Sequence, residues 1–219
     1  NKDKRKLAKK LGTTSKGIAP CYADKMARTG QLARDVLSPD LLWDENLHGR
    51  VLCEGAQGYY LDVDQGNYPY VTSSTTLPYG ACSLGFPPQK IRRIWGISKI
   101  YDTRSGVDPL FPMDLQKDEE LTKLGDLGQE FGVTTGRRRT CNWLNLDMMI
   151  EAARITGTTH LVINKCDIIR ELGIFKCYSE GELKEFTSYN KMTEYITDKI
   201  GKSNSLAKHI YLSNSPERL

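Results

Sequence analysis

The 219-residue sequence has neither long apolar runs nor paired cysteines, and both absences exclude classes of protein. No stretch approaches the roughly 18 consecutive apolar residues that a membrane-spanning helix needs, and no signal peptide is visible. The cysteines are scattered without a C-x-x-C pair, which argues against a zinc site and against a secreted disulfide framework. They are Cys21, Cys53, Cys82, Cys141, Cys166 and Cys177. We expect reduced thiols and a cytoplasmic protein.

The sequence also has few histidines and only a small net charge. His48, His160 and His209 lack metal-ligand spacing, and the net charge of +4 is too small to indicate nucleic-acid binding, although it suits anionic small substrates. No repeat, low-complexity tract or linker divides the chain. We therefore expect one domain over residues 1–219. Because the chain starts at Asn1, in what reads as mid-helix, we expect it to be part of a longer protein whose N-terminal portion is absent.

Helical and strand patterns alternate along the chain, which favours an α/β fold with ligands at the strand ends. Apolar residues from Asn145 onward follow the spacing of an amphipathic helix. The remaining helices are expected at 20–37, after Pro87–Pro88, at 117–131 and at 190–201. Strands are expected at 50–55, 97–101, 160–165 and from 209, with a hairpin over 175–189 turned at Glu180–Gly181.

The segment "GVTTGRRRTCNW", residues 132–143, has the composition of an anion-binding loop. Its glycines allow tight backbone geometry, its threonines offer hydroxyl groups, and arginine forks bind carboxylates or phosphates with two hydrogen bonds. In an extended loop, Arg137 and Arg139 would face one side while Arg138 turns away. A solvated surface run of charge is the alternative interpretation.

The tetrad "NKCD", residues 164–167, directly follows an expected strand. This pattern and place are typical of guanine recognition in GTP-binding proteins, where the aspartate accepts hydrogen bonds from guanine and the lysine stem packs along the ring. The pattern is short, so a purely structural role is the alternative.

Two further segments combine glycine with small polar residues. "GTTSKGIAP", residues 12–20, leads into a helix start that suits phosphate, although it lacks the spacing of a Walker loop. "VLCEGAQGYYLDVDQGNYPYVTSS", residues 51–74, places Gln57 between Gly55 and Gly58, where an amide could approach a planar base. An ordinary capping turn and an ordinary loop are the respective alternatives.

Taken in order, these segments resemble the adenylosuccinate synthetase family. The resemblance rests on "GTTSKGIAPCYADKMARTG", the 51–74 segment, "YDTRSGVDPLFP", "FGVTTGRRRTCNW", "INKCD" and "SNSPER". It implies a mostly parallel central sheet flanked by helices, in a synthetase fold like that of P-loop NTPases. It also implies a ligase that phosphorylates the 6-oxygen of a purine nucleotide, usually IMP, with GTP and Mg²⁺, and then displaces the phosphate with the amine of L-aspartate.

The resemblance assigns roles residue by residue. The catalytic assignment is Gln57, which would stabilise the phosphorylated intermediate. The purine nucleotide would contact Thr14, Arg28, Gln57, Leu61, Thr72, Ser105 and Arg137, with Arg28 reaching the neighbouring subunit of a homodimer. L-Aspartate would contact Val133, Thr134, Thr135, Gly136, Arg137 and Arg139. The nucleoside triphosphate would contact Arg139, Asn164, Lys165, Asp167, Ser213, Asn214 and Ser215.

Some expected parts of the pattern are missing or altered. The family's catalytic aspartate, catalytic histidine and phosphate loop would precede Gly12, so the Mg²⁺ ligands are expected there and on the triphosphate, and this chain alone is expected to be inactive. Ser15, Lys16, Ser105 and Ser215 depart from the usual residues. They leave open a viral relative that uses dGMP with ATP, dATP or GTP instead of IMP with GTP. A GTP-binding regulatory protein is the third alternative, and it predicts no aspartate loop.

Overall fold

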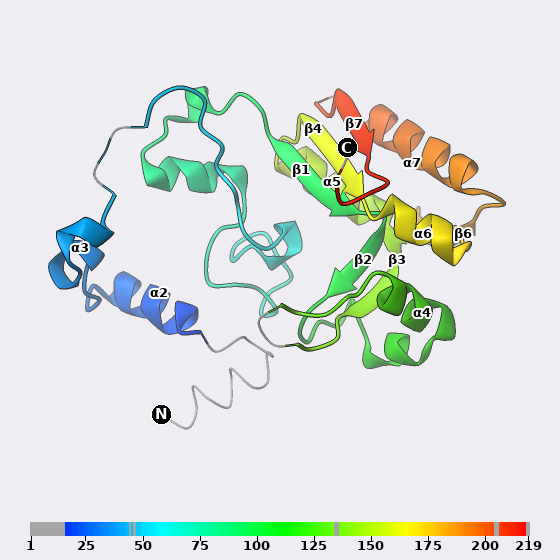
Figure 1. Cartoon of the computed structure of the whole chain (residues 1–219), viewed down its shortest axis with the longest axis horizontal. Coiled ribbons are helices and arrows are strands. Elements are labelled where there is room, and N and C mark those ends of the chain that lie inside the picture. The colour runs from blue at the N-terminus through cyan, green and yellow to red at the C-terminus, as the bar shows by residue number, and fades with distance from the viewer. Residues whose placement is uncertain (1–15, 44, 46, 134–135, 204–205, 218–219) are drawn as a thin grey trace. The chain divides into compact units, whose positions relative to one another are not determined.

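The computed structural model describes residues 16–43, 45, 47–133, 136–203 and 206–217. The chain divides into two compact units, one containing Pro87–Leu219 and the other Ser15–Phe86. Figure 1 traces both units along the chain. Each is described by itself below, and a single domain over the whole chain stays a prediction.

The unit from Pro87 contains a three-stranded parallel sheet in the order β1–β4–β7. Its strands are β1 (Trp95–Lys99), β4 (His160–Asn164) and β7 (His209–Leu212). Lys99 is paired with Asn164, and the backbone N–H of Ser213 donates to the Ile163 carbonyl at 2.9 Å. The carboxyl ends of the three strands therefore meet at one edge, which is where parallel sheets present ligand-binding residues.

A second, mixed sheet has the order β2–β3–β5–β6. It consists of β2 (Tyr101–Arg104), β3 (Thr140–Asn145), β5 (Lys176–Ser179) and β6 (Glu182–Glu185). The β3–β5 pairing is parallel, whereas β2–β3 and β5–β6 are antiparallel. The expected α/β class is confirmed, with the strands divided between two sheets. The expected hairpin is also confirmed, since Glu180 and Gly181 both have the positive φ of a two-residue hairpin turn.

Among the helices of this unit, α4 and α5 begin at a side-chain cap. The helices are α4 (Glu119–Leu127), α5 (Leu146–Ile155), α6 (Cys166–Leu172) and α7 (Tyr189–Ser203), with short 3₁₀ turns at Pro88–Lys90 and Met113–Lys117. The Asp118 carboxylate accepts from the Leu121 N–H at 2.9 Å, and the Asn145 amide oxygen accepts from the Met148 N–H at 3.1 Å. Each side chain satisfies an N–H that has no partner within its helix.

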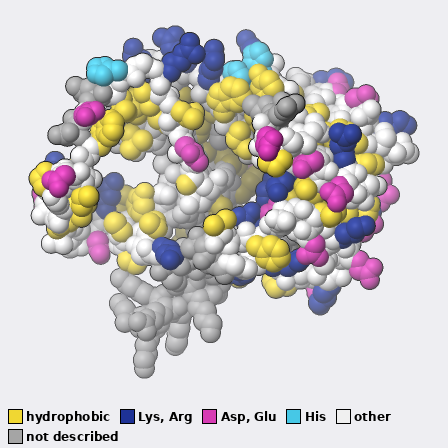
Figure 2. Space-filling view, viewed as in Figure 1, with side chains coloured by type: hydrophobic (Ala, Val, Ile, Leu, Met, Phe, Trp, Pro, Cys, Tyr) yellow, Lys and Arg dark blue, Asp and Glu magenta, His cyan; other side chains and the backbone are white. Residues whose placement is uncertain are grey.

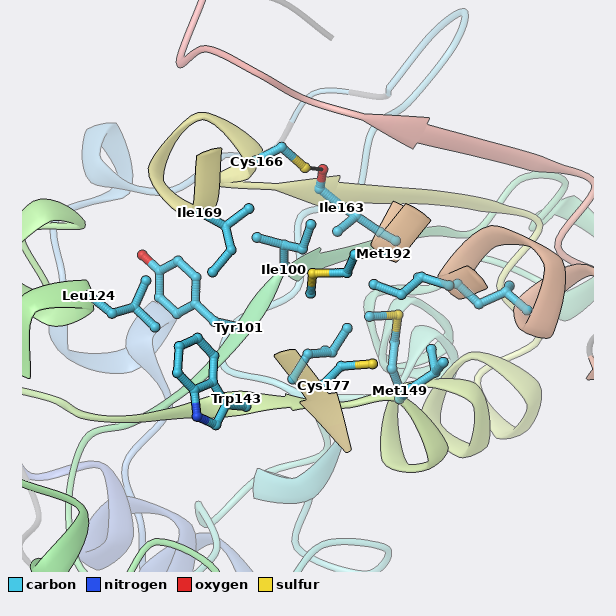
Figure 3. Close-up of a cluster of buried hydrophobic side chains, with 14 of the residues drawn as sticks. Ile100, Tyr101, Leu124, Trp143, Met149, Ile163, Cys166, Ile169, Cys177 and Met192 are labelled. Carbon is cyan, nitrogen blue, oxygen red and sulfur yellow. Dashed lines mark hydrogen bonds between the residues drawn. The ribbon is translucent and has the colours of Figure 1, made fainter. Parts of the chain in front are cut away.

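One hydrophobic core joins both sheets of this unit to the four helices. Figure 3 shows Ile100 and Ile163 facing Met192, with Tyr101 beside Leu124 and Trp143. Burial of this apolar surface is the main force that fixes the strand ends in place. At the surface, acidic and basic side chains are mixed in Figure 2 over the part of the face where α4, α6 and α7 lie in Figure 1.

The unit Ser15–Phe86 is built from short helices and loops. Its elements are α2 (Ile18–Ala27), α3 (Ala33–Val36) and the 3₁₀ turns Pro39–Leu41, Tyr59–Leu61 and Pro78–Leu84. The buried Asp62 organises the later loop: its Oδ1 accepts from the backbone N–H groups of Asp64 and Gln65, and its Oδ2 accepts from the Thr75 hydroxyl and the Thr76 N–H. Burial alone raises the pKa of this carboxyl, but these four donors outweigh burial and lower it.

Three expected elements need correction. The strand at 50–55 is wrong: these residues join no ladder among the described residues, and Leu52 is 85% exposed. The helix over 20–37 is broken, because Arg28 adopts a left-handed conformation and the Thr29 and Gly30 N–H groups turn back to the Asp24 carbonyl. The strand at 97–101 is two strands, since the chain leaves β1 after Lys99 and pairs with β3 from Tyr101.

Candidate functional site

The loop between α4 and β3 holds the arginine motif in a compact turn. The N–H of Gly132 donates to the Arg137 carbonyl at 2.8 Å, and the N–H of Gly136 donates to the Gly132 carbonyl at 2.7 Å. Gly136 has φ of 63°, a conformation that glycine adopts at little cost. Val133 is 99% exposed at the tip, and Thr134 and Thr135 lie outside the described residues. The described residues on either side, Val133 and Gly136, are thus exposed to solvent.

Successive arginines of this loop have separate partners. Arg138 forms an ion pair with Asp126 and donates to the Thr122 carbonyl at 2.7 Å, so it is held by α4. Arg139 instead donates from Nη1 to Oε2 of Glu130 at 2.9 Å. Neighbouring arginines therefore have different partners, and the shared ligand-facing side expected for Arg137 and Arg139 stays a prediction. Arg137 is exposed, and its proposed contacts with ligands stay a prediction.

Glu130 is the buried centre of a hydrogen-bond network that sequence reasoning missed. Its side chain accepts from Lys99 at 2.8 Å on each oxygen, from the Tyr101 hydroxyl at 2.7 Å and from Arg139. Burial by itself raises the pKa of this carboxyl, but the donors outweigh burial and hold the pKa below its ordinary value. Glu130 is therefore ionised at neutral pH and compensates the cations around it. The signal in the sequence was a lone acid seven residues before the arginine run.

The "NKCD" tetrad lies at the shared carboxyl edge of the parallel sheet. Asn164 ends β4, Lys165 caps α6 with φ of 62°, and Asp167 lies in the first turn of α6. The Lys165 ammonium donates to the Gly128 carbonyl at 3.0 Å. This hydrogen bond fixes the position of the ammonium group. The methylene stem of Lys165 runs from the backbone to that point and offers an apolar surface along which a flat ring could pack.

The "SNSP" segment continues from β7 beside the tetrad. The Cys166 N–H donates to the Ser213 carbonyl at 3.1 Å, and the Ser213 hydroxyl donates to the Ser215 carbonyl at 3.0 Å. The Asn214 amide oxygen accepts from the Tyr189 hydroxyl at 3.1 Å. These contacts bring Ser213, Asn214 and Ser215 together with the start of α6. The buried Oδ1 of Asn164 has no hydrogen-bond partner among the described residues.

Ser105 lies in the loop after β2. The flanking Arg104 and Asp108 are both buried and form an ion pair, with 3.3 Å between Arg104 Nε and Asp108 Oδ2. This pair closes the loop and leaves Ser105 exposed between them.

In the unit Ser15–Phe86, four expected contacts of the purine nucleotide are described. Leu61 ends a 3₁₀ turn, and its carbonyl accepts the Thr72 N–H at 2.8 Å, which brings these two residues together. Gln57 is exposed and precedes the same turn. Arg28 ends α2, where its guanidinium donates to the Met26 carbonyl at 3.3 Å. Thr14 lies outside the described residues.

Positive φ angles mark several of the candidate residues. Among described residues other than glycine, such angles occur at Arg28, Gln57, Gln129, Lys165 and Glu180. Three of these five carry expected ligand contacts, and Gln129 lies between Gly128 and Glu130. A left-handed conformation outside glycine is uncommon and costs on the order of 1 kcal/mol or more. Strain concentrated in this way supports a functional role for these positions.

No three His, Cys, Asp or Glu side chains in the described parts of the chain come together as a metal site. Within the same residues, every helix is too short or too polar to cross a bilayer.

Comparison with known proteins gives consistent matches. The chain is 39% identical to an adenylosuccinate synthetase of Thermodesulfovibrio yellowstonii, over 74% of this chain and 50% of the relative. It is 38% identical to that of Thermosynechococcus vestitus, over 78% of this chain and 49% of the relative. The chain thus spans about half the length of the curated relatives it matches.

Solved structures share the fold. A fully ligated adenylosuccinate synthetase from Plasmodium falciparum superimposes with a TM-score of 0.72 at 23% identity, covering 98% of this chain and 71% of that chain. A cyanophage S-2L succinoaminodeoxyadenylate synthetase, bound to dGMP and dATP, matches with a TM-score of 0.50 at 20% identity, over 74% of this chain and 43% of that one. The family model for adenylosuccinate synthetase matches residues 1–49 and 40–198. The chain therefore belongs to the adenylosuccinate synthetase family.

Proposed function

We propose that this chain supplies the amino-acid and nucleoside-triphosphate sites of a ligase that condenses L-aspartate with the 6-oxo position of IMP. GTP transfers its γ-phosphoryl group to the purine 6-oxygen, and the aspartate amine then displaces that phosphate, giving adenylosuccinate, GDP and phosphate. A carbonyl-like oxygen is a poor leaving group until it is phosphorylated. The principal support is that the arginine loop and the "NKCD" tetrad are connected within one unit, because both contact the turn Gly128–Glu130.

The arginine loop is the proposed aspartate site. Its exposed tip carries Val133 and Gly136, and its base carries Arg137 and Arg139. The guanidinium fork of Arg139 uses Nη1 for Glu130 and has further N–H donors with which to bind a substrate carboxylate. Thr134 and Thr135 complete the proposed contacts. The α-amino group would then face the purine as the nucleophile.

The sheet edge is the proposed GTP site. The Asp167 carboxylate would accept hydrogen bonds from guanine N1–H and the 2-amino group. Adenine carries an acceptor at N1, which would repel the same carboxylate. The Lys165 stem would pack along the ring, and residues 213–215 would close over it beside Asn164. Mg²⁺ would be bound by the triphosphate and would neutralise charge there, while this chain's residues position the base.

The unit Ser15–Phe86 is proposed to bind the purine nucleotide, as part of a cytoplasmic homodimer. Gln57 would address the 6-position, Leu61 would pack on the base, and Thr14 and Thr72 would contact phosphate. Arg28 is exposed at the end of α2, as a contact across a dimer requires.

A chimera tests this function. Residues of this chain would replace the matching half of the Thermodesulfovibrio yellowstonii enzyme, and aspartate-dependent phosphate release would be measured with IMP or dGMP, each with GTP or ATP. We expect turnover with IMP and GTP. Turnover with dGMP alone would instead support the alternative represented by the cyanophage protein. GTP hydrolysis that is independent of aspartate would favour a GTP-binding protein and contradict the ligase proposal.

A further inference from the structure

The turn Gly128–Glu130, at the end of α4, contacts both proposed ligand sites at once. The Gly128 carbonyl accepts from Lys165 of the triphosphate site, and two residues later Glu130 binds Arg139 of the aspartate site. No role in ligand binding was expected for any of the three turn residues. The turn therefore connects the two motifs through two hydrogen bonds.

Arg139 is attached to Glu130 at two points. Its backbone N–H donates to the Glu130 carbonyl at 2.8 Å, and its Nη1 donates to the Glu130 carboxylate at 2.9 Å. The backbone hydrogen bond fixes the chain just before β3, and the side-chain hydrogen bond fixes the direction of the guanidinium. Together they limit the rotamers that Arg139 can adopt.

The Glu130 carboxylate is fully used by internal donors. Glu130 is 1% exposed, and its two oxygens accept four hydrogen bonds from Lys99, Tyr101 and Arg139. A carboxylate offers about four acceptor positions, so none is left for a substrate. Glu130 consequently acts through its neighbours and does not contact a reacting group.

Gly128 is required for the Tyr101 contact. A Cβ at Gly128 would overlap the Tyr101 hydroxyl, which must lie there to reach Glu130. The same glycine supplies the carbonyl that binds Lys165. Any displacement of Tyr101 or Glu130 is thus transmitted to the Lys165 ammonium as well as to Arg139.

The cations around Glu130 require a negative charge at this position. Lys99 is half-buried beside Arg139 and Lys165, and burial together with these two cations lowers its pKa despite the bond to Glu130. Removing the charge of Glu130 would leave Lys99 and Arg139 close together with no shared anion. Repulsion would then turn Arg139 away from its present direction.

We propose that Glu130 is a positioning residue that sets Arg139 for L-aspartate and, through the Gly128 carbonyl, Lys165 for the nucleoside triphosphate. The proposal rests on the proposed function for the identity of the two ligands. The position of Arg139 itself does not depend on that function and can be measured without any ligand.

The ligand test compares Glu130→Gln with wild type by titration of L-aspartate and of GTP in the chimera. We expect the dissociation constant of L-aspartate to rise about tenfold or more and that of GTP to rise about threefold, from loss of charge-assisted hydrogen bonds. Glu120→Gln is the matched control, because Glu120 lies in the neighbouring helix α4 and is likewise paired with a lysine, Lys176, at 2.8 Å. Equal effects of the two variants would overturn the proposal.

A ligand-free test separates this proposal from the proposed function. Phenylglyoxal modification of the 219-residue chain, read by mass spectrometry, compares Arg139 with its neighbour Arg138, which is held by Asp126 instead. We expect Glu130→Gln to accelerate modification of Arg139 several-fold while Arg138 stays unchanged. If Glu130→Gln does not fold, Tyr101→Phe replaces it as the test variant. We expect it to accelerate modification of Arg139 by about threefold or less, again with Arg138 unchanged. Equal changes at both arginines, or none at Arg139, would contradict a positioning role.

Discussion

The Asp102 carboxylate accepts a hydrogen bond from the backbone N–H of Asn145 at 2.8 Å, and this contact joins β2 to the residue that caps α5. Burial raises the pKa of Asp102 to about 7, although the Asn145 N–H and the nearby Lys99 act in the opposite direction. The group therefore titrates near neutral pH in the folded state and near pH 4 when unfolded.

The free energy of unfolding should fall as pH rises from about 4 to 7, because the unfolded chain loses the Asp102 proton first. Asp102→Asn keeps an acceptor for Asn145 and removes the ionisation. We expect it to raise stability at pH 8 by on the order of 2 kcal/mol and to flatten this pH dependence. Urea unfolding at pH 5 and pH 8 measures both effects. Asp114→Asn, at an exposed ion pair with Lys117, is the control and should leave the slope unchanged.

Arg139 and Arg138 offer a paired test of the aspartate loop. Arg139→Leu should raise the dissociation constant of L-aspartate about 30-fold or more, since truncating a buried charged partner typically costs roughly 2–5 kcal/mol. Arg138→Leu should lower stability through loss of its α4 contacts and change aspartate binding far less. Calorimetric titration in the chimera separates the two. An unchanged aspartate affinity in Arg139→Leu would remove this residue from the proposed site.

The network around Asp62 predicts how acid weakens the unit Ser15–Phe86. Its lowered pKa means that its stabilising contribution is present above the unfolded pKa, near 3.8, and is lost as pH falls through the folded value. Asp62→Ala leaves several donors unsatisfied and should increase amide exchange over residues 62–76 more than tenfold, at a cost of about 1–3 kcal/mol. Exchange within α7 serves as the reference. Uniform acceleration across both segments would show that Asp62 does not act locally.

Local signals in the sequence predicted much of the fold. The α5 helix was predicted because its apolar spacing is contained within a short segment, and the structure adds the Asn145 cap at its start. The hairpin was found because Glu180–Gly181 supplies the positive φ angles that such a turn requires. These features depend on neighbouring residues alone.

Features that depend on distant residues were missed. The apolar letters at 50–55 predicted a strand, but a strand needs a partner, and none is paired with these residues in the described part of the chain. Glu130 went unnoticed because Lys99 lies 31 residues earlier, and only the fold brings the two together. A buried polar network is assembled from several elements, so no single segment shows it.

Base recognition by Asp167 can be tested by exchanging one hydrogen-bond acceptor for a donor. In Asp167→Asn, the side chain keeps an oxygen for a ring N–H but presents an NH₂ group where guanine also has one. GTP affinity should fall about tenfold or more, because a buried donor is left opposite a donor. Xanthosine triphosphate has an oxygen at that position, so its affinity should rise in the same variant. Competition titrations of both nucleotides measure the exchange, with Asp147→Asn in α5 as the control. If GTP weakens and xanthosine triphosphate fails to gain, Asp167 does not read the 2-position of the base.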